Sequence, residues 1–109
     1  MAIAVEGGYG WLKRAAAAWD RGCTEGSAPA AATAAVAQAN LTRSAVEALA
    51  MTVIDIAQQA VGCAGLIEPH PLERRLRDLM AYLRQPNPDG ALAQAGQAVA
   101  NGTWEPHTW

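Results

Sequence analysis

Residues 70–89, HPLERRLRDLMAYLRQPNPD, contain one helix together with its start and stop signals. His70 can cap the helix, and Pro71 follows at the first helical position, where a missing N–H costs nothing. QPNPDG then ends it, because prolines and glycine do not continue a helix. Between these signals the leucines recur at steps of 4, 3 and 4 residues: Leu72, Leu76, Leu79 and Leu83. The segment therefore predicts a helix over 71–84 with one apolar face.

Upstream of this helix the sequence predicts a long helix over about 29–61. Its apolar residues also step by 3 or 4, which indicates a core-facing stripe: Val46, Leu49, Val53, Ile56 and Ala60. Asp55 lies off this stripe, so we expect it to face solvent or a partner rather than the core. Gly62, Gly65 and Pro69 then break the helix.

Two shorter helices are predicted at the ends of the chain. One covers about 9–21, with Trp11, Ala15 and Trp19 on one face, and stops at Gly22. The other covers 88–100, starts at Asn87 as its cap, and has an apolar stripe of Leu92, Ala95 and Val99. No strand pattern appears. We expect one all-α domain over 1–109, an antiparallel bundle of four helices with a tail over 101–109 in which Trp104 is covered.

Composition and charge exclude several classes of function. The chain has 109 residues, a net charge of −2, 51% hydrophobic residues and no phenylalanine. Alanine-rich helices bury little area, so we expect thin, closely packed helices that gain from a partner surface. There is no basic excess for nucleic acid. Neither a signal peptide nor a run of about 18 uninterrupted apolar residues is found, so we expect a cytoplasmic protein without a membrane span. Cys23 and Cys63 are expected to be reduced thiols.

Few residues of the sequence suggest a metal-binding or anion-binding site. His70 and His107 are far apart in sequence, and no metal site is expected. In the helix over 71–84, Glu73–Arg77 and Arg74–Asp78 have the i, i+4 spacing of a solvated face of ion pairs. Alternatively, its guanidinium groups bind a phosphate or carboxylate across an interface.

Three aromatic side chains also allow two interpretations. Trp11, Trp19 and Tyr82 could line an apolar substrate pocket between helices, or they could simply fill the core. The sequence alone identifies no nucleophile and no catalytic triad.

Residues 57–92, AQQAVGCAGLIEPHPLERRLRDLMAYLRQPNPDGAL, resemble the C-terminal helical domain of the acyl-CoA dehydrogenase family. The likeness rests on the turn from Gly62 to Gly65, on Leu72-Glu73-Arg74, and on the pair Arg77-Asp78. It extends over roughly residues 28–100. The family's N-terminal helical domain and middle β-barrel domain have no counterpart in these 109 residues.

The resemblance implies a flavin-related role. FAD in this family lies between the barrel and the bundle helices and reaches across a subunit boundary. By that likeness, Arg74 or Arg77 helps to order a flavin-proximal loop or a subunit contact, and FAD binds only together with a partner chain. The position of the glutamate base of many family members corresponds to Pro86 here. The resemblance thus leaves the catalytic residue unknown.

Three functional hypotheses follow. The first is a small subunit of a split acyl-CoA dehydrogenase-like flavoprotein that completes the FAD site and the oligomer for oxidation of an acyl thioester, in biosynthesis. The second is a stand-alone flavin-free enzyme, a cyclase or isomerase, that uses a cleft in the bundle. The third is a non-catalytic oligomerisation protein. The expected partners are a second copy of the chain or a larger flavin-binding chain.

Overall fold

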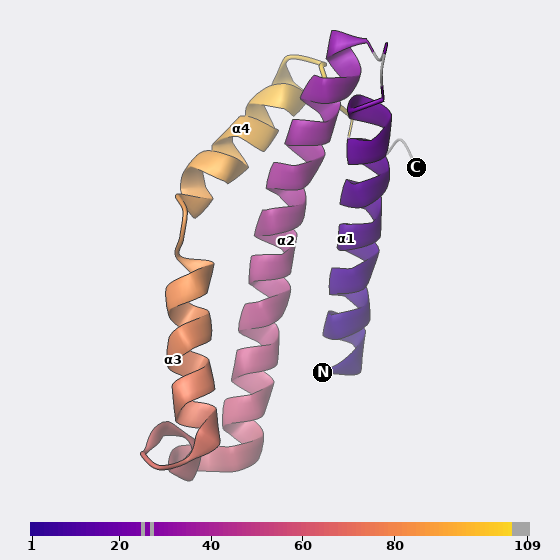
Figure 1. The fold of residues 1–109 in the computed structure, drawn as a ribbon. Coiled ribbons are helices and arrows are strands. Elements are labelled where there is room, and N and C mark those ends of the chain that lie inside the picture. Colours follow the sequence, from indigo (N-terminus) through magenta and orange to yellow (C-terminus); the bar gives the residue numbers. More distant parts are fainter. Residues whose placement is uncertain (25, 27, 106–109) are drawn as a thin grey trace.

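The computed structural model describes residues 1–24, 26 and 28–105, and these residues form helices and connecting turns without any strand. The helices are α1 (Ala2–Gly22), α2 (Pro29–Val61), α3 (Pro71–Leu83) and α4 (Pro88–Ala100), and a 3₁₀ turn, Gly62–Leu66, joins α2 to α3 (Figure 1). The all-helical prediction is confirmed. His107 and the rest of the predicted tail beyond residue 105 lie outside the described residues.

The helix boundaries agree with the sequence except at the N-terminus. α2 and α4 have their predicted bounds, and α3 ends at Leu83, one residue earlier than expected. The helix expected over 9–21 instead begins at Ala2. The glycines at 7, 8 and 10 favour a turn by intrinsic propensity. The packing of α1 along α2 overrides that preference and extends the helix.

α2 is the central element. α1 runs beside it on one side, and α3 and α4 follow one another along the other side, as Figure 1 shows. Over most of its length α2 therefore has two neighbours, whereas its C-terminal end extends past the start of α1 and lies beside α3 alone, so the bundle stays open and long (Figure 1). Its extents are 54 × 25 × 24 Å, and its radius of gyration is 16.9 Å, against about 13 Å for a compact domain of this size.

The helices pack on α2 in two different ways. α1 and α4 approach it more closely than α3 does, because small residues such as Ala4, Gly22 and Ala95 lie at their contacts. α3 is held off by its larger side chains. The predicted leucine face of α3 packs there against α2, and the resulting cluster consists of Ile54, Leu76, Leu83, Ala50, Met51, Leu72 and Leu79.

The stripes predicted on α2 and α4 are partly wrong. On α2 the buried residues are Ala35, Ala37, Thr42 and Ile54, all outside the predicted stripe, while Ala60 is exposed. One stripe cannot describe a helix that has neighbours on two sides. On α4 only Ala95 of the predicted stripe is buried, whereas Leu92 and Val99 are exposed. A small side chain allows the close contact with α2, and the larger ones are left outside.

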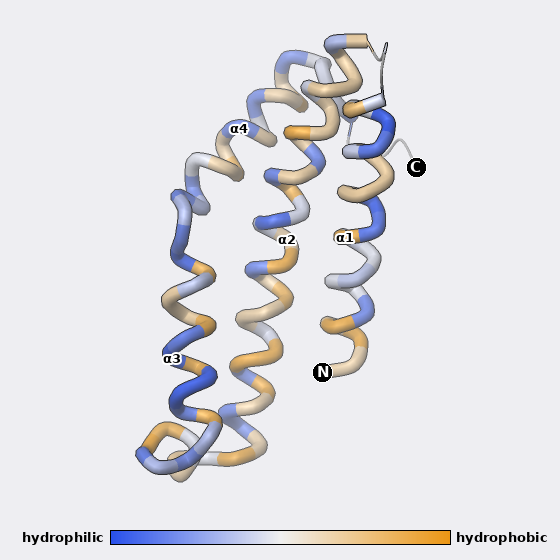
Figure 2. The backbone as a smooth tube through the Cα atoms, viewed as in Figure 1, coloured by the Kyte–Doolittle hydropathy of each residue, from blue (hydrophilic) through white to orange (hydrophobic). Residues whose placement is uncertain are grey.

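The larger apolar side chains of the described chain lie mostly at its surface, and none of them is fully buried. Figure 2 shows apolar residues along all of α2 and on the outer helices as well. The exposed ones include Val5, Tyr9, Leu12, Trp19, Leu66, Ile67, Tyr82, Leu92 and Val99. A monomer with so much apolar surface is expected to associate with another surface.

One segment is also long and apolar enough to cross a membrane, by length and composition alone. It covers Pro29–Leu66, so it is α2 with the 3₁₀ turn that follows. The central helix of a soluble bundle meets the same criterion, and Arg43, Glu47 and Asp55 all lie within α2. The expectation of a protein without a membrane span stays a prediction.

Candidate functional site

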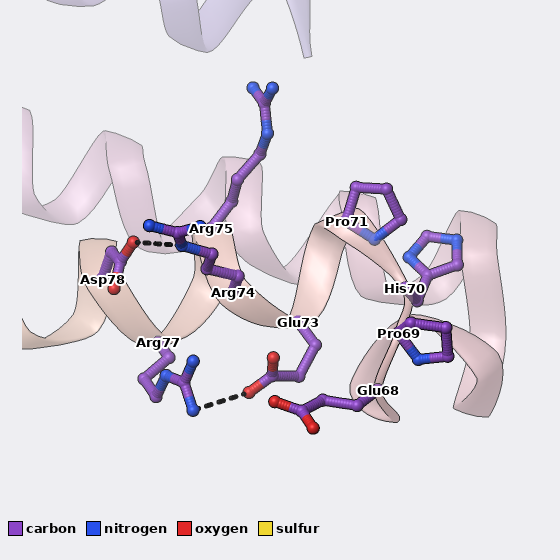
Figure 3. A pocket seen from close by; sticks show the side chains of 9 residues that line it. All are labelled: Glu68, Pro69, His70, Pro71, Glu73, Arg74, Arg75, Arg77 and Asp78. Carbon is purple, nitrogen blue, oxygen red and sulfur yellow. Dashed lines mark ion pairs between the residues drawn. The ribbon is translucent and has the colours of Figure 1, made fainter.

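The first candidate site is an open depression at the start of α3, with a volume of about 530 Å³ and formed by residues 68–71, 73–75, 77 and 78 (Figure 3). His70 caps the helix at the edge of this depression, because the imidazole Nδ1 accepts a hydrogen bond from the backbone N–H of Leu72 at 3.1 Å. With His70 as its cap, the helix begins at Pro71, as the sequence predicts. The arginines of the next turns therefore lie beside the chain reversal.

The two predicted ion pairs are present. Arg77 Nη1 lies 3.4 Å from Glu73 Oε1, and Arg74 Nε lies 3.8 Å from Asp78 Oδ2, as the dashed lines in Figure 3 mark. The side chain of Arg74 is 81% exposed, and that of Arg77 is 61% exposed. Exposed pairs of this kind contribute about 0.5 kcal/mol or less to stability. These arginines are therefore available to exchange a carboxylate for another anion.

Arg75 differs from its neighbours. In Figure 3 its side chain extends away from both ion pairs, and it forms no ion pair with another described residue. The depression thus presents three guanidinium groups against the carboxylates of Glu68, Glu73 and Asp78. The described residues contain no group of three or more His, Cys, Asp or Glu side chains that could hold a metal ion.

The second candidate site is an apolar groove of about 410 Å³ between α1, α2 and the turn that joins α3 to α4. Leu12 and Ala15 line it from α1, Val46 from α2, and Tyr82 and Pro86 from the end of α3 and the turn. Tyr82 is 76% exposed and lies at the rim. The volume of the groove falls within the range of small-molecule sites, although the solvent-facing side of the groove is open.

The structure does not bring the three predicted pocket aromatics together. Only Tyr82 lines the groove. Trp11 is half-buried beneath Arg14, whose Cζ lies 4.0 Å from the ring centroid. Trp19 is 56% exposed. Successive i, i+4 steps drift around a helix, so Trp11 and Trp19 end on different faces. Trp104, which we expected to be covered, is half-buried.

A polar network at the groove was not predicted from the sequence. Arg43 Nη2 donates to the carbonyl oxygens of Leu83 at 3.3 Å and Gln85 at 3.0 Å. The Glu47 carboxylate lies 3.7 Å from Nη1 of both Arg43 and Arg84. Arg43 thus places a cation at the C-terminal end of α3, where the last carbonyls lack helical partners. One feature of the sequence does single out Arg43, because it is the only basic residue within residues 29–61.

Two smaller predictions, for Asp55 and for the cysteines, agree with the structure. Asp55 is exposed and accepts a hydrogen bond from Gln59 Nε2 at 2.8 Å, so it faces solvent as expected. Cys23 and Cys63 are both free and exposed. They are therefore unpaired thiols within the chain.

Comparisons with family models, with curated proteins and with solved structures give no match for this chain.

Proposed function

We propose that the chain is a helical subunit of an acyl-CoA dehydrogenase-like flavoprotein, in which another chain supplies the β-barrel and most of the flavin site. One observation carries the proposal: alanines and glycines fill the contacts of α1 and α4 with α2, while larger apolar side chains such as Leu12, Trp19 and Leu92 lie outside. Such a chain gains stability when another surface covers those side chains. A subunit role explains this arrangement better than a self-sufficient monomer does.

The segment that resembles the family has a shape that suits this role. Residues 57–92 run from the end of α2 through the 3₁₀ turn to α3 and the start of α4. The leucines of α3 face α2, so Arg74 and Arg77 are left on the outer side near the end of the molecule. A second chain can reach them there without any rearrangement of the helices.

The residues of the depression fit only one part of FAD. The guanidinium groups of Arg74 and Arg77 would hold the pyrophosphate, by the bidentate geometry that arginine offers to phosphate oxygens. The open depression provides no enclosing apolar slot for the isoalloxazine ring among the described residues. The ring would therefore contact the other chain. Bound FAD would supply the hydride acceptor for oxidation of the acyl thioester.

Purification from the organism of origin tests this proposal. A tagged form of the chain should be isolated at low salt and analysed by native mass spectrometry and visible absorption. We expect a complex that contains a larger chain and the absorption bands of oxidised flavin, which are bleached by an acyl-CoA substrate. A colourless preparation that contains this chain alone would overturn the proposal.

Arginine variants locate the flavin contact within that complex. Arg77→Ala and Arg74→Ala should each lower the affinity for FAD about tenfold, since each removes a charge-assisted hydrogen bond. Arg21→Ala, an exposed change at the far end of α1, serves as the matched control. Equal flavin content in all three complexes would remove both arginines from the proposed site.

The apolar groove supports a second candidate, a flavin-free cyclase or isomerase. Its support is the position of Arg43 and Glu47 beside an apolar wall large enough for a small ligand. This candidate requires that the purified, colourless chain catalyse a reaction by itself. It also requires that Tyr82→Ala, at the rim, change the KM for that substrate.

A further inference from the structure

α1 has two apolar faces, and one of them forms the close contact with α2. The inner face is built from small residues and Trp11, and it includes Ala4, Ala15 and Gly22. The outer face follows a steady 3,4 spacing and is exposed along its whole length: Ala2, Val5, Tyr9, Leu12, Ala16 and Trp19. This spacing is the a/d pattern of a coiled-coil seam. None of these six side chains is buried against another described element.

We propose that this outer face pairs antiparallel with the same face of a second copy of the chain. When the two-fold axis lies between Tyr9 and Leu12, each Tyr9 meets Leu12 of the second copy. In the next layers Val5 meets Ala16, and in the outermost layers Ala2 meets Trp19. The outer layers thus combine a larger side chain with alanine, which is the volume balance that close helix packing requires.

The charges beside the seam favour the same arrangement. Glu6 and Lys13 both occupy the flank of the outer face that points away from α2, and both are exposed. Neither forms an ion pair with another described residue. In the antiparallel register, Glu6 of each copy lies beside Lys13 of the other, so two symmetric ion pairs form. Flanking charges of this kind set partner and orientation in coiled coils.

A parallel pairing would lack this complementarity. It would place Lys13 of one copy beside Gly8 of the other, and Gly8 carries no charge. Leu12 also lines the apolar groove, so the antiparallel pair covers one edge of that groove too. The proposal concerns this chain alone and does not depend on the proposed flavin-binding chain.

Charge exchange tests the pairing in the purified full chain. Sedimentation equilibrium should show a dimer that weakens on the order of tenfold in Glu6→Lys and in Lys13→Glu, because attraction is replaced by repulsion on both sides. The double variant E6K/K13E should restore the dimer. Asp55→Lys on exposed α2 is the matched control and should leave the affinity unchanged. Additive weakening in the double variant would overturn the register.

A change within the seam tests the surface itself. Leu12→Asp should weaken the dimer about 100-fold or more, because two carboxylates would be buried without partners. Ile67→Asp, an equally polar change at an exposed apolar residue after the 3₁₀ turn, should have no effect. Circular dichroism checks that both variants stay helical. A dimer that survives Leu12→Asp would overturn the proposal.

Cross-linking then separates the two orientations. In a background with Cys23→Ser and Cys63→Ser, chains carrying Val5→Cys should form disulfides with chains carrying Ala16→Cys. Val5→Cys alone should stay monomeric on a non-reducing gel. Rapid cross-linking of Val5→Cys with itself would indicate a parallel pair and overturn the antiparallel arrangement. A chain that binds only a different protein or phosphatidylcholine vesicles, and never itself, would also overturn it.

Discussion

Arg43 connects two helices that have few close backbone approaches. It extends from the middle of α2 to the carbonyl oxygens of Leu83 and Gln85, where α3 ends. Glu47, one helical turn further along α2, holds both Arg43 and Arg84 at 3.7 Å. A single side chain therefore binds a carbonyl oxygen at the end of α3 and another in the turn that leads to α4. The bond to Leu83 is partly buried, the bond to Gln85 is exposed, and the Arg43 side chain is 26% exposed, so water competes with this contact less than with the exposed pairs of α3.

We therefore expect Arg43→Met to lower the free energy of unfolding by about 2 kcal/mol, because two backbone carbonyls lose a charged donor. Arg74→Met is the matched control. Its arginine is 81% exposed, so the expected change is about 0.5 kcal/mol or less. Urea titrations followed by circular dichroism, with the slope held common, measure both values. Equal effects of the two changes would contradict the capping role of Arg43.

At the scale of the element, the contact between α1 and α2 depends on the absence of side chains. A Cβ atom built on Gly22 would lie 2.9 Å from the Cβ of Ala35 and 3.0 Å from the carbonyl oxygen of Ala31. The second of these atoms belongs to the backbone of α2, which cannot rotate away. α1 and α2 can approach this closely only because Gly22 ends the first helix at their contact.

This geometry predicts opposite effects for two identical substitutions within one helix. Gly22→Ala should destabilise the protein by about 1–3 kcal/mol, because the new methyl group overpacks the helix contact. Gly10→Ala should stabilise it by about 0.5–1 kcal/mol, since no atom lies within 4 Å of the added Cβ and alanine is the better helix former. Thermal unfolding of the two variants checks the signs. Stabilisation by both changes would show that α1 and α2 pack less closely.

The same contact explains which parts of the fold could be predicted. Where one face of a helix packs on one neighbour, as in α3, the leucine spacing indicated the buried residues correctly. Where alanine makes the contact, as at Ala95, the predicted stripe included this residue but also the larger Leu92 and Val99, which are exposed. The pairs beside Glu73 and Asp78 could be predicted because they are local. The Arg43 network could not, because it joins residues about forty positions apart.

At the scale of the whole molecule, a long open bundle has one small apolar cluster and a large apolar surface. The cluster lies between α2 and α3, whereas α1 and α4 contribute mainly small side chains. The free energy of folding available from burial is therefore low for a chain of this length. Association that covers the outer face of α1 would add apolar burial without changing the helices. Stability and assembly are thus expected to be coupled in this protein.

This coupling predicts a midpoint of thermal unfolding, Tm, that depends on protein concentration. If the folded state is a dimer through α1 and the unfolded state is monomeric, Tm should rise on the order of 3 °C for each tenfold increase in concentration. The Leu12→Asp variant should unfold at a lower Tm that does not change with concentration, because its folded state is already monomeric. Scanning calorimetry over a hundredfold range of concentration, with repeat scans to confirm reversibility, measures both. Ile67→Asp should keep the concentration dependence of the wild type, since its side chain lies outside the seam. A wild-type Tm that stays constant over that range would mean that the apolar surface of α1 contributes nothing to folding by self-association.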